Sequence, residues 1–92
     1  MGYGIQVINK HNKEVAFFHY HMDEKDKPLH KVLNVKISDN NKVEKPYSKG
    51  QLLDAKSKLM NISGTLGEQD FLSACLLEMK ETNVTSILIT FN

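Results

Sequence analysis

Two segments of alternating side chains, joined by a short polar link, place the strongest constraint on how this chain folds. Residues 3–9 alternate weakly between apolar and polar side chains, and residues 14–22 are rich in β-branched and aromatic ones. Successive side chains of a strand point to opposite faces, so this spacing predicts two strands. The link at 10–13 reads Lys-His-Asn-Lys, which is typical of a turn. We therefore expect an antiparallel hairpin.

The apolar residues of this hairpin also predict its register. Pairing Asn9 with Glu14 brings residues of both strands together on one face, in the pairs Val7–Ala16, Ile5–Phe18 and Tyr3–Tyr20. Cross-strand pairs of aromatic and β-branched residues stabilise such a ladder. Because the side-chain period is two, the opposite face then carries a second set: Gln6, Ile8, Val15, Phe17, His19 and His21.

The middle of the chain is predicted to add one or two strands. Residues 31–38 alternate between apolar and polar side chains, which indicates a third strand. The Asn-Asn dipeptide at 40–41 is typical of a turn. Residues 42–45 are then expected to form a short strand at the edge of the sheet.

A first helix is predicted to begin after Ser48. Ser48 with Gln51 three residues later matches a capping box, in which each side chain accepts a hydrogen bond from the other residue's backbone. The expected apolar stripe comprises Leu52, Leu53, Ala55, Leu59 and Met60. Asn61 and Gly64 are expected to end the helix.

A second helix and a final strand complete the pattern. Thr65 and Glu68 form a second predicted capping box. Apolar residues then recur at helical spacing, at Phe71, Leu72, Cys75, Leu76 and Met79. Residues 84–91 alternate again and are predicted to form a strand with Ile87, Ile89 and Phe91 on one face.

The order of elements is therefore β-β-β-(β)-α-α-β. Runs of strands followed by helices are typical of the α+β class. We expect residues 1–92 to form one small α+β domain, because 92 residues leave no room for a second. Its mostly antiparallel sheet of four to five strands is expected to carry two helices on one face.

Composition narrows the function classes. The single cysteine, Cys75, excludes an internal disulfide and a zinc cage of several thiolates, which favours a reducing compartment. No apolar run approaches the roughly 20 residues that span a bilayer, and the first residues do not resemble a secretion signal. We expect a cytoplasmic protein without membrane contact. No catalytic constellation or cofactor motif has a recognisable spacing, so we expect a non-enzymatic protein without a cofactor.

The main candidate for a binding surface is the second face of the sheet. If both helices cover the face that holds Ile5 and Phe18, apolar residues remain on the other, with Val32 and Leu88 as further candidates. Proteins rarely expose such a patch without using it. The predicted partner-binding residues are Ile8, Val15, Phe17, His19 and His21.

A lysine-rich segment suggests a second surface, for nucleic acid. All twelve basic residues are lysine, so the bidentate grip of arginine on phosphate is absent. Lysines can still neutralise phosphates as point charges. The candidates lie between residues 25 and 49: Lys25, Lys27, Lys31, Lys36, Lys42, Lys45 and Lys49. Acidic residues within the segment dilute its positive charge.

Three smaller features are weighed as sites. His19 and His21 point to the same face of a strand and are a candidate metal pair, with Asp23, Glu24, His11 or His30 as the third ligand. The turn at 63–67 precedes a predicted helix, and helix N-termini attract phosphate, but the turn lacks the Gly-Lys-Ser/Thr of a Walker loop. Cys75 falls on an apolar stripe, where a thiol is inert.

The sequence thus favours a small interaction protein that docks to a larger protein through a sheet face, as an inhibitor or regulator. Its size and composition also fit a phage or mobile-element protein. A homodimer formed through the same face is compatible with this hypothesis. A nucleic-acid accessory protein and a small metal-binding protein are the two alternatives.

Overall fold

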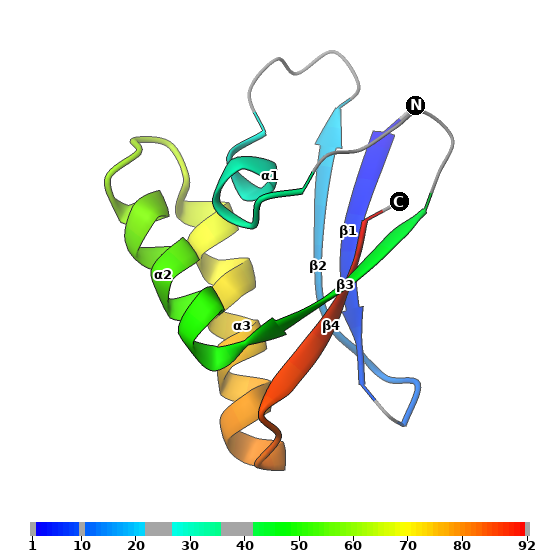
Figure 1. The fold of residues 1–92 in the computed structure, drawn as a ribbon. Coiled ribbons are helices and arrows are strands. Elements are labelled where there is room, and N and C mark those ends of the chain that lie inside the picture. Colours follow the sequence, from blue (N-terminus) through cyan, green and yellow to red (C-terminus); the bar gives the residue numbers. More distant parts are fainter. Residues whose placement is uncertain (1, 10, 22–26, 36–41, 92) are drawn as a thin grey trace.

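A four-stranded antiparallel sheet forms one layer of the computed structural model, and helices form the other (Figure 1). The structure describes residues 2–9, 11–21, 27–35 and 42–91. Along the chain the elements are β1 (Gly2–Ile8), β2 (Glu14–His21), α1 (Pro28–Val32), β3 (Val43–Ser48), α2 (Lys49–Met60), α3 (Leu66–Thr82) and β4 (Ser86–Phe91). The strand order is β2-β1-β4-β3. The predicted α+β class is confirmed.

The hairpin of β1 and β2 has the predicted register over most of its length. Three pairs are confirmed: Tyr3–Tyr20, Ile5–Phe18 and Val7–Ala16. The predicted pairing of Asn9 with Glu14 is wrong, because Ile8 pairs with Glu14 and the register shifts between Val7 and Ile8. Between these two pairs the register moves by two residues along β2 but by only one along β1, which defines a β-bulge. The extra residue is Val15.

The predicted strand over residues 31–38 is wrong where the structure describes it. Pro28 begins the short helix α1, whose first position suits the fixed φ of proline. Asn34 then adopts φ 57°, and the N–H groups of Asn34 and Val35 donate to the carbonyls of Lys31 and His30 at 3.3 and 3.0 Å. This is a Schellman ending. Leu29 and Leu33 are buried in the core, but they belong to α1 and its C-cap and not to a strand.

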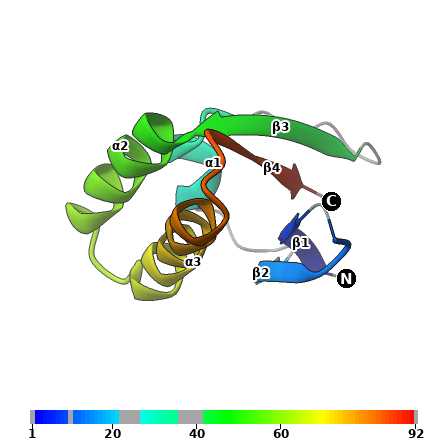
Figure 2. The ribbon, with the colours of Figure 1, turned by 90° about the horizontal axis from the view of Figure 1, so that it is seen from below.

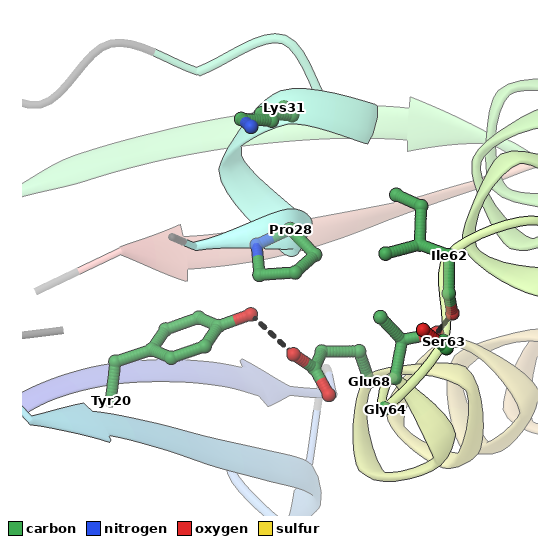
Figure 3. Close-up of a pocket in the computed structure, with 8 residues that line it drawn as sticks. Tyr20, Pro28, Lys31, Ile62, Ser63, Gly64 and Glu68 are labelled. Atoms are coloured by element: carbon green, nitrogen blue, oxygen red, sulfur yellow. Dashed lines mark hydrogen bonds between the residues drawn. The ribbon is translucent and has the colours of Figure 1, made fainter. Parts of the chain in front are cut away.

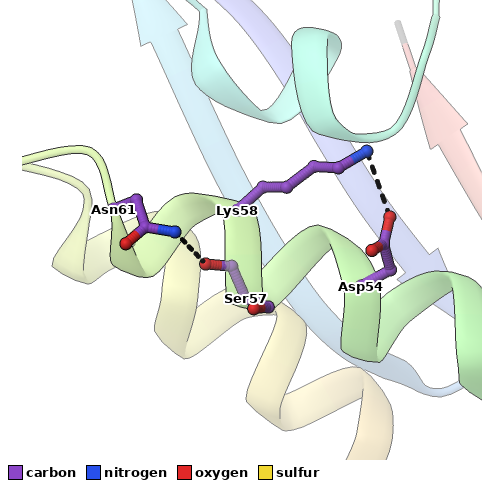
Figure 4. Close-up of polar contacts among 4 residues, drawn as sticks. All are labelled: Asp54, Ser57, Lys58 and Asn61. Atoms are coloured by element: carbon purple, nitrogen blue, oxygen red, sulfur yellow. Dashed lines mark hydrogen bonds and ion pairs between the residues drawn. The ribbon is translucent and has the colours of Figure 1, made fainter.

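The first long helix, α2, begins as predicted. Ser48 Oγ accepts from the backbone N–H of Gln51 at 3.3 Å, and Gln51 Oε1 accepts from the N–H of Ser48 at 2.8 Å. The capping box is confirmed. Of the predicted stripe, Leu52, Ala55 and Leu59 are buried, but Leu53 and Met60 are exposed. The outward side of α2 instead holds an Asp54–Lys58 ion pair at 3.1 Å (Figure 4).

The second long helix, α3, begins differently from the prediction. The Thr65 hydroxyl lies within 2.8 Å of the carbonyl oxygens of both Leu59 and Ile62, so it ties the turn to the end of α2 and caps nothing in α3. The second capping box is therefore wrong. The predicted stripe of α3 is confirmed, with Phe71, Leu72, Cys75 and Met79 buried and Leu76 partly buried.

The two layers bury a single core and leave one sheet face open. Ile5, Val7, Ile87, Ile89 and Phe91 point into the helix layer and are buried. All three described helices lie on that side of the sheet, and no described element covers the other (Figure 2). None of the described helices is long and apolar enough to cross a membrane.

Candidate functional site

The open face of the sheet is the candidate site. Register and alternation define which side chains occupy it. Gln6 pairs with both Phe17 and Thr90, and Thr90 pairs with Glu44, which gives one row across all four strands. The adjacent row holds Ile8 of β1, Leu88 of β4 and Pro46 of β3. Leu88 pairs with Pro46, and Ile8 lies two residues after Gln6, so it is on the same face of β1. A third row on the same side holds Gly4 and His19, which pair across β1 and β2. We call these rows the open face.

Apolar side chains on the open face are substantially exposed. Phe17 is 53% exposed, and Ile8 and Leu88 are each 44% exposed. Ile8 and Leu88 also line a hollow of about 220 Å³, together with Val84 and His11 from the turns below the sheet. Buried apolar surface stabilises a complex, so this cluster is a suitable centre for an interface.

Phe17 is held in place by its neighbours on the same face. A methyl group at Gly4 would lie 3.2 Å from Cε2 of Phe17, so the ring covers the bare backbone of the neighbouring strand. The Phe17 and His19 rings also stack, with centroids 6.5 Å apart and planes 20° apart. A ring fixed in this way loses little conformational entropy when a partner covers it.

The structure places the other predicted partner-binding residues unequally. Ile8, Phe17 and His19 lie on the open face as expected. Val15 does not: it packs against the core and lines a hollow with Ala74 and Leu77 of α3, because of the bulge. His21 ends β2, and its side chain lies outside the described part. Val32 belongs to α1, not to a sheet face.

The predicted lysine surface is only partly described. Lys25 and Lys36 lie outside the described residues. Lys42 pairs with Glu44 at 3.4 Å, and Lys45 Nζ donates to the carbonyl of Asn34 at 3.1 Å while lying 5.9 Å from the centre of the Tyr47 ring. Lys27 precedes α1, Lys31 is within it and Lys49 begins α2. The nucleic-acid hypothesis stays a prediction.

The two candidate third ligands that the structure describes, His30 and His11, lie elsewhere in the fold. His30 lies on the helix side of the sheet, where its ring is 5.9 Å from those of both Tyr20 and Phe91, and burial together with the nearby Lys27 charge lowers its pKa. His11 lies at the turn below the sheet. Among the side chains that the structure describes, no group of three or more His, Cys, Asp or Glu could hold a metal ion. Asp23, Glu24 and the His21 side chain lie outside this part.

A polar pair that sequence reasoning missed joins three elements on the helix side. The Tyr20 hydroxyl donates to Glu68 Oε2 at 2.9 Å and accepts from the N–H of Leu29 at 3.2 Å. Glu68 is only 7% exposed. The pair borders a half-open hollow of about 340 Å³ beneath Pro28 and Ile62 (Figure 3). A carboxylate here, beside the turn at 63–67, disfavours the phosphate site considered for that turn.

The remaining features are the buried thiol of Cys75 and the exposed apolar residues around the turn between α2 and α3. Cys75 is fully buried, and burial raises the pKa of its thiol to about 12, so it is an inert core residue as predicted. Three apolar residues that the sequence did not mark as a surface, Met60, Ile62 and Leu66, are exposed around the turn between α2 and α3.

Comparison of this chain with family models, with curated proteins and with solved structures gave no match.

Proposed function

We propose that this chain is a protein-docking module whose open face binds a larger protein and regulates or inhibits it in the cytoplasm. The observation that carries the proposal is the exposed apolar cluster of Phe17, Ile8 and Leu88 on the uncovered side of the sheet. A monomer gains nothing from leaving such residues in water, whereas a partner surface would bury them.

The surroundings of the cluster indicate the chemistry of the partner. Gln6, Thr90, Ser86 and His19 place polar groups beside the apolar residues, and Glu44 lies at the β3 end of the face. A polar rim around an apolar centre is typical of protein interfaces. The expected partner surface is apolar at its centre and carries hydrogen-bonding groups at its edge, without strong charge.

The size of the face limits the strength of binding. The strands are six to eight residues long, so four of them at spacings of about 4.8 Å give a face of roughly 400–500 Å². A standard stable interface buries about 800 Å² on each partner. One copy of the face is therefore suited to a weak contact, unless the partner also covers the hollow beside Ile8 and Val84.

The test compares the wild type with Leu88→Asp and with a matched control, Leu66→Asp. Leu66 is the more exposed leucine, at 75%, but it lies at the start of α3, away from the open face. Each purified variant is immobilised, and nuclease-treated extract is passed over it. We expect one retained protein to bind wild type and Leu66→Asp alike, and to be lost from Leu88→Asp. Calorimetry with that purified protein should then give a dissociation constant at least about tenfold weaker for Leu88→Asp, since one buried leucine contributes ~1.5–3 kcal/mol. Equal affinities for the two aspartate variants would refute docking through the open face.

A further inference from the structure

The two central strands of the sheet diverge at one end, and a hollow lies between them. The described pairing of β1 with β4 ends at Val7 and Ile89. The next residues of the two strands towards this end, Ile8 and Leu88, both line a hollow of about 220 Å³. The turn between β1 and β2 and the turn between α3 and β4 lie at this same end of the molecule (Figure 1). The hollow is therefore bordered by two strands and two turns.

Hydrogen bonds hold the described parts of both turns. The Oδ1 atom of Asn9 accepts from the backbone N–H groups two and four residues further on, at 2.9 and 3.0 Å. After α3, Asn83 adopts φ 54°, and the N–H of Val84 donates to the carbonyl of Met79 at 3.2 Å. This is the hydrogen bond of a Schellman ending. A hollow with walls held in this way needs little ordering when a ligand enters, which favours binding.

The residues around the hollow favour an uncharged ligand. Ile8, Val84 and Leu88 give it apolar walls and are themselves substantially exposed. The polar residues that also line it carry hydroxyl, amide or imidazole groups: Thr82, Ser86, Asn9 and His11. The described lining residues include no lysine and no carboxylate. A carboxylate or ammonium group would therefore lose hydration on entering without meeting a fixed opposite charge.

We propose that this hollow binds one aromatic side chain of the partner protein, and that this side chain is the anchor of the docking contact. A cavity of about 150 Å³ lined by Leu, Ile and Phe holds benzene, so about 220 Å³ leaves room for a phenyl ring in a more open hollow. Aromatic residues are enriched among the anchors of protein interfaces, because they bury a large area with few rotatable bonds. The inference rests on the proposed function for the source of the ring, whereas binding of a ring to the hollow can be measured without any partner.

The limited area of the open face is the reason why such an anchor is needed. The face offers roughly 400–500 Å², whereas a standard interface buries about 800 Å² on each partner. An inserted ring would bury a further ~150–250 Å² of the partner's own side chain. The hollow is continuous with the open face, because Ile8 and Leu88 belong to both. The expected partner surface therefore carries an uncharged aromatic side chain that projects beside the part covering the face.

The first test uses the wild-type full chain and needs no partner. The isotope-labelled protein is titrated with the N-acetyl amides of phenylalanine, leucine and lysine, and the backbone amide signals are followed by NMR. We expect the phenylalanine probe to shift the signals of Ile8, Val84 and Leu88 with a saturable, millimolar dissociation constant. The leucine probe should bind at least about threefold more weakly, and the lysine probe should shift none of the three signals. The absence of a saturable shift with the phenylalanine probe overturns the proposal, as does equal or tighter binding of the leucine probe.

The second test fills the hollow with a ring of the chain itself. Val84→Phe adds a ring at a lining residue, and Leu53→Phe adds one at an exposed position on α2, away from the hollow. We expect Val84→Phe to weaken binding of the phenylalanine probe and of the retained partner about tenfold or more, and Leu53→Phe to change neither. A partner that binds Val84→Phe as tightly as wild type, but is lost from Leu88→Asp, would refute the anchor and leave docking through the open face standing. If wild type retains no partner, the proposed function fails and the anchor role fails with it, whereas saturable binding of the probe to wild type would still assign the hollow as an aromatic site. The wild-type titration decides that point even where Val84→Phe does not fold.

Discussion

Removing one hydroxyl group, by Tyr20→Phe, should test what holds the two layers together. The hydroxyl donates to the Glu68 carboxylate and accepts from the Leu29 amide, so it joins β2, α3 and α1 at one point. A hydrogen bond to a charged group contributes about 1.5–3 kcal/mol, and an unpaired buried amide costs about 1 kcal/mol more. We expect the free energy of unfolding to fall by about 3 kcal/mol. That is a large fraction of the 5–15 kcal/mol typical of a domain.

The assay is urea unfolding followed by circular dichroism, with Tyr47→Phe as the matched control. The Tyr47 hydroxyl is also buried, but it donates at 2.8 Å to the neutral carbonyl of Leu33. Its loss should therefore cost only about 1 kcal/mol. The double variant Tyr20→Phe/Glu68→Leu should recover part of the loss, because it removes the buried carboxylate that Tyr20→Phe leaves unpaired. A loss below about 0.5 kcal/mol for Tyr20→Phe would refute the reasoning, as would equal losses for the two tyrosines.

Two further predictions concern the core thiol and the start of α2. Burial raises the pKa of the Cys75 thiol from 9.0 to about 12, so the folded state favours the protonated thiol. The stability that this preference provides is complete below pH 9 and is lost as the pH rises towards 12. Urea unfolding measured between pH 9 and 12 should show that the free energy of unfolding falls less steeply with pH in Cys75→Ala than in the wild type. Parallel plots of this free energy against pH would contradict a buried thiol with a raised pKa. Ser48→Ala removes the capping box and should lower the free energy of unfolding by about 1 kcal/mol. Ser57→Ala, within the same helix, should leave it unchanged or slightly higher, and a similar loss in both variants would argue against a role for the cap.

The parts of the fold that the sequence predicts correctly are those where a local rule and burial agree. The pairs Ile5–Phe18 and Val7–Ala16 follow from alternation, because a slip of one residue would move every apolar side chain to the wrong face. The capping box of Ser48 uses contacts only three residues apart. In each case the partner is near in sequence, and no distant element is needed to decide the structure.

The parts that the sequence misses depend on distant partners. The sequence pattern places Glu68 in a capping box with Thr65. In the structure its carboxylate accepts a hydrogen bond from the hydroxyl of Tyr20, 48 residues away. Leu53 and Met60 fit the apolar stripe of α2, but α3 and α1 cover only the side that holds Leu52, Ala55 and Leu59. The open face was predicted in part, through Ile8, Phe17 and His19. The role of Pro46 in it became visible only with the pairing of β3 and β4.

The helix α1 shows why alternation alone misleads in a short segment. Leu29, Leu33 and Val35 are all buried, and Leu33 and Val35 have the spacing of a strand. Leu29 and Leu33 are equally compatible with one turn of helix, because residues four apart share a helix face. The deciding signals are Pro28, which fixes φ at the first helical position, and Asn34, which adopts the left-handed conformation that ends the turn. The described part of this segment, residues 27–35, therefore forms a short helix and a turn on the helix side of the sheet.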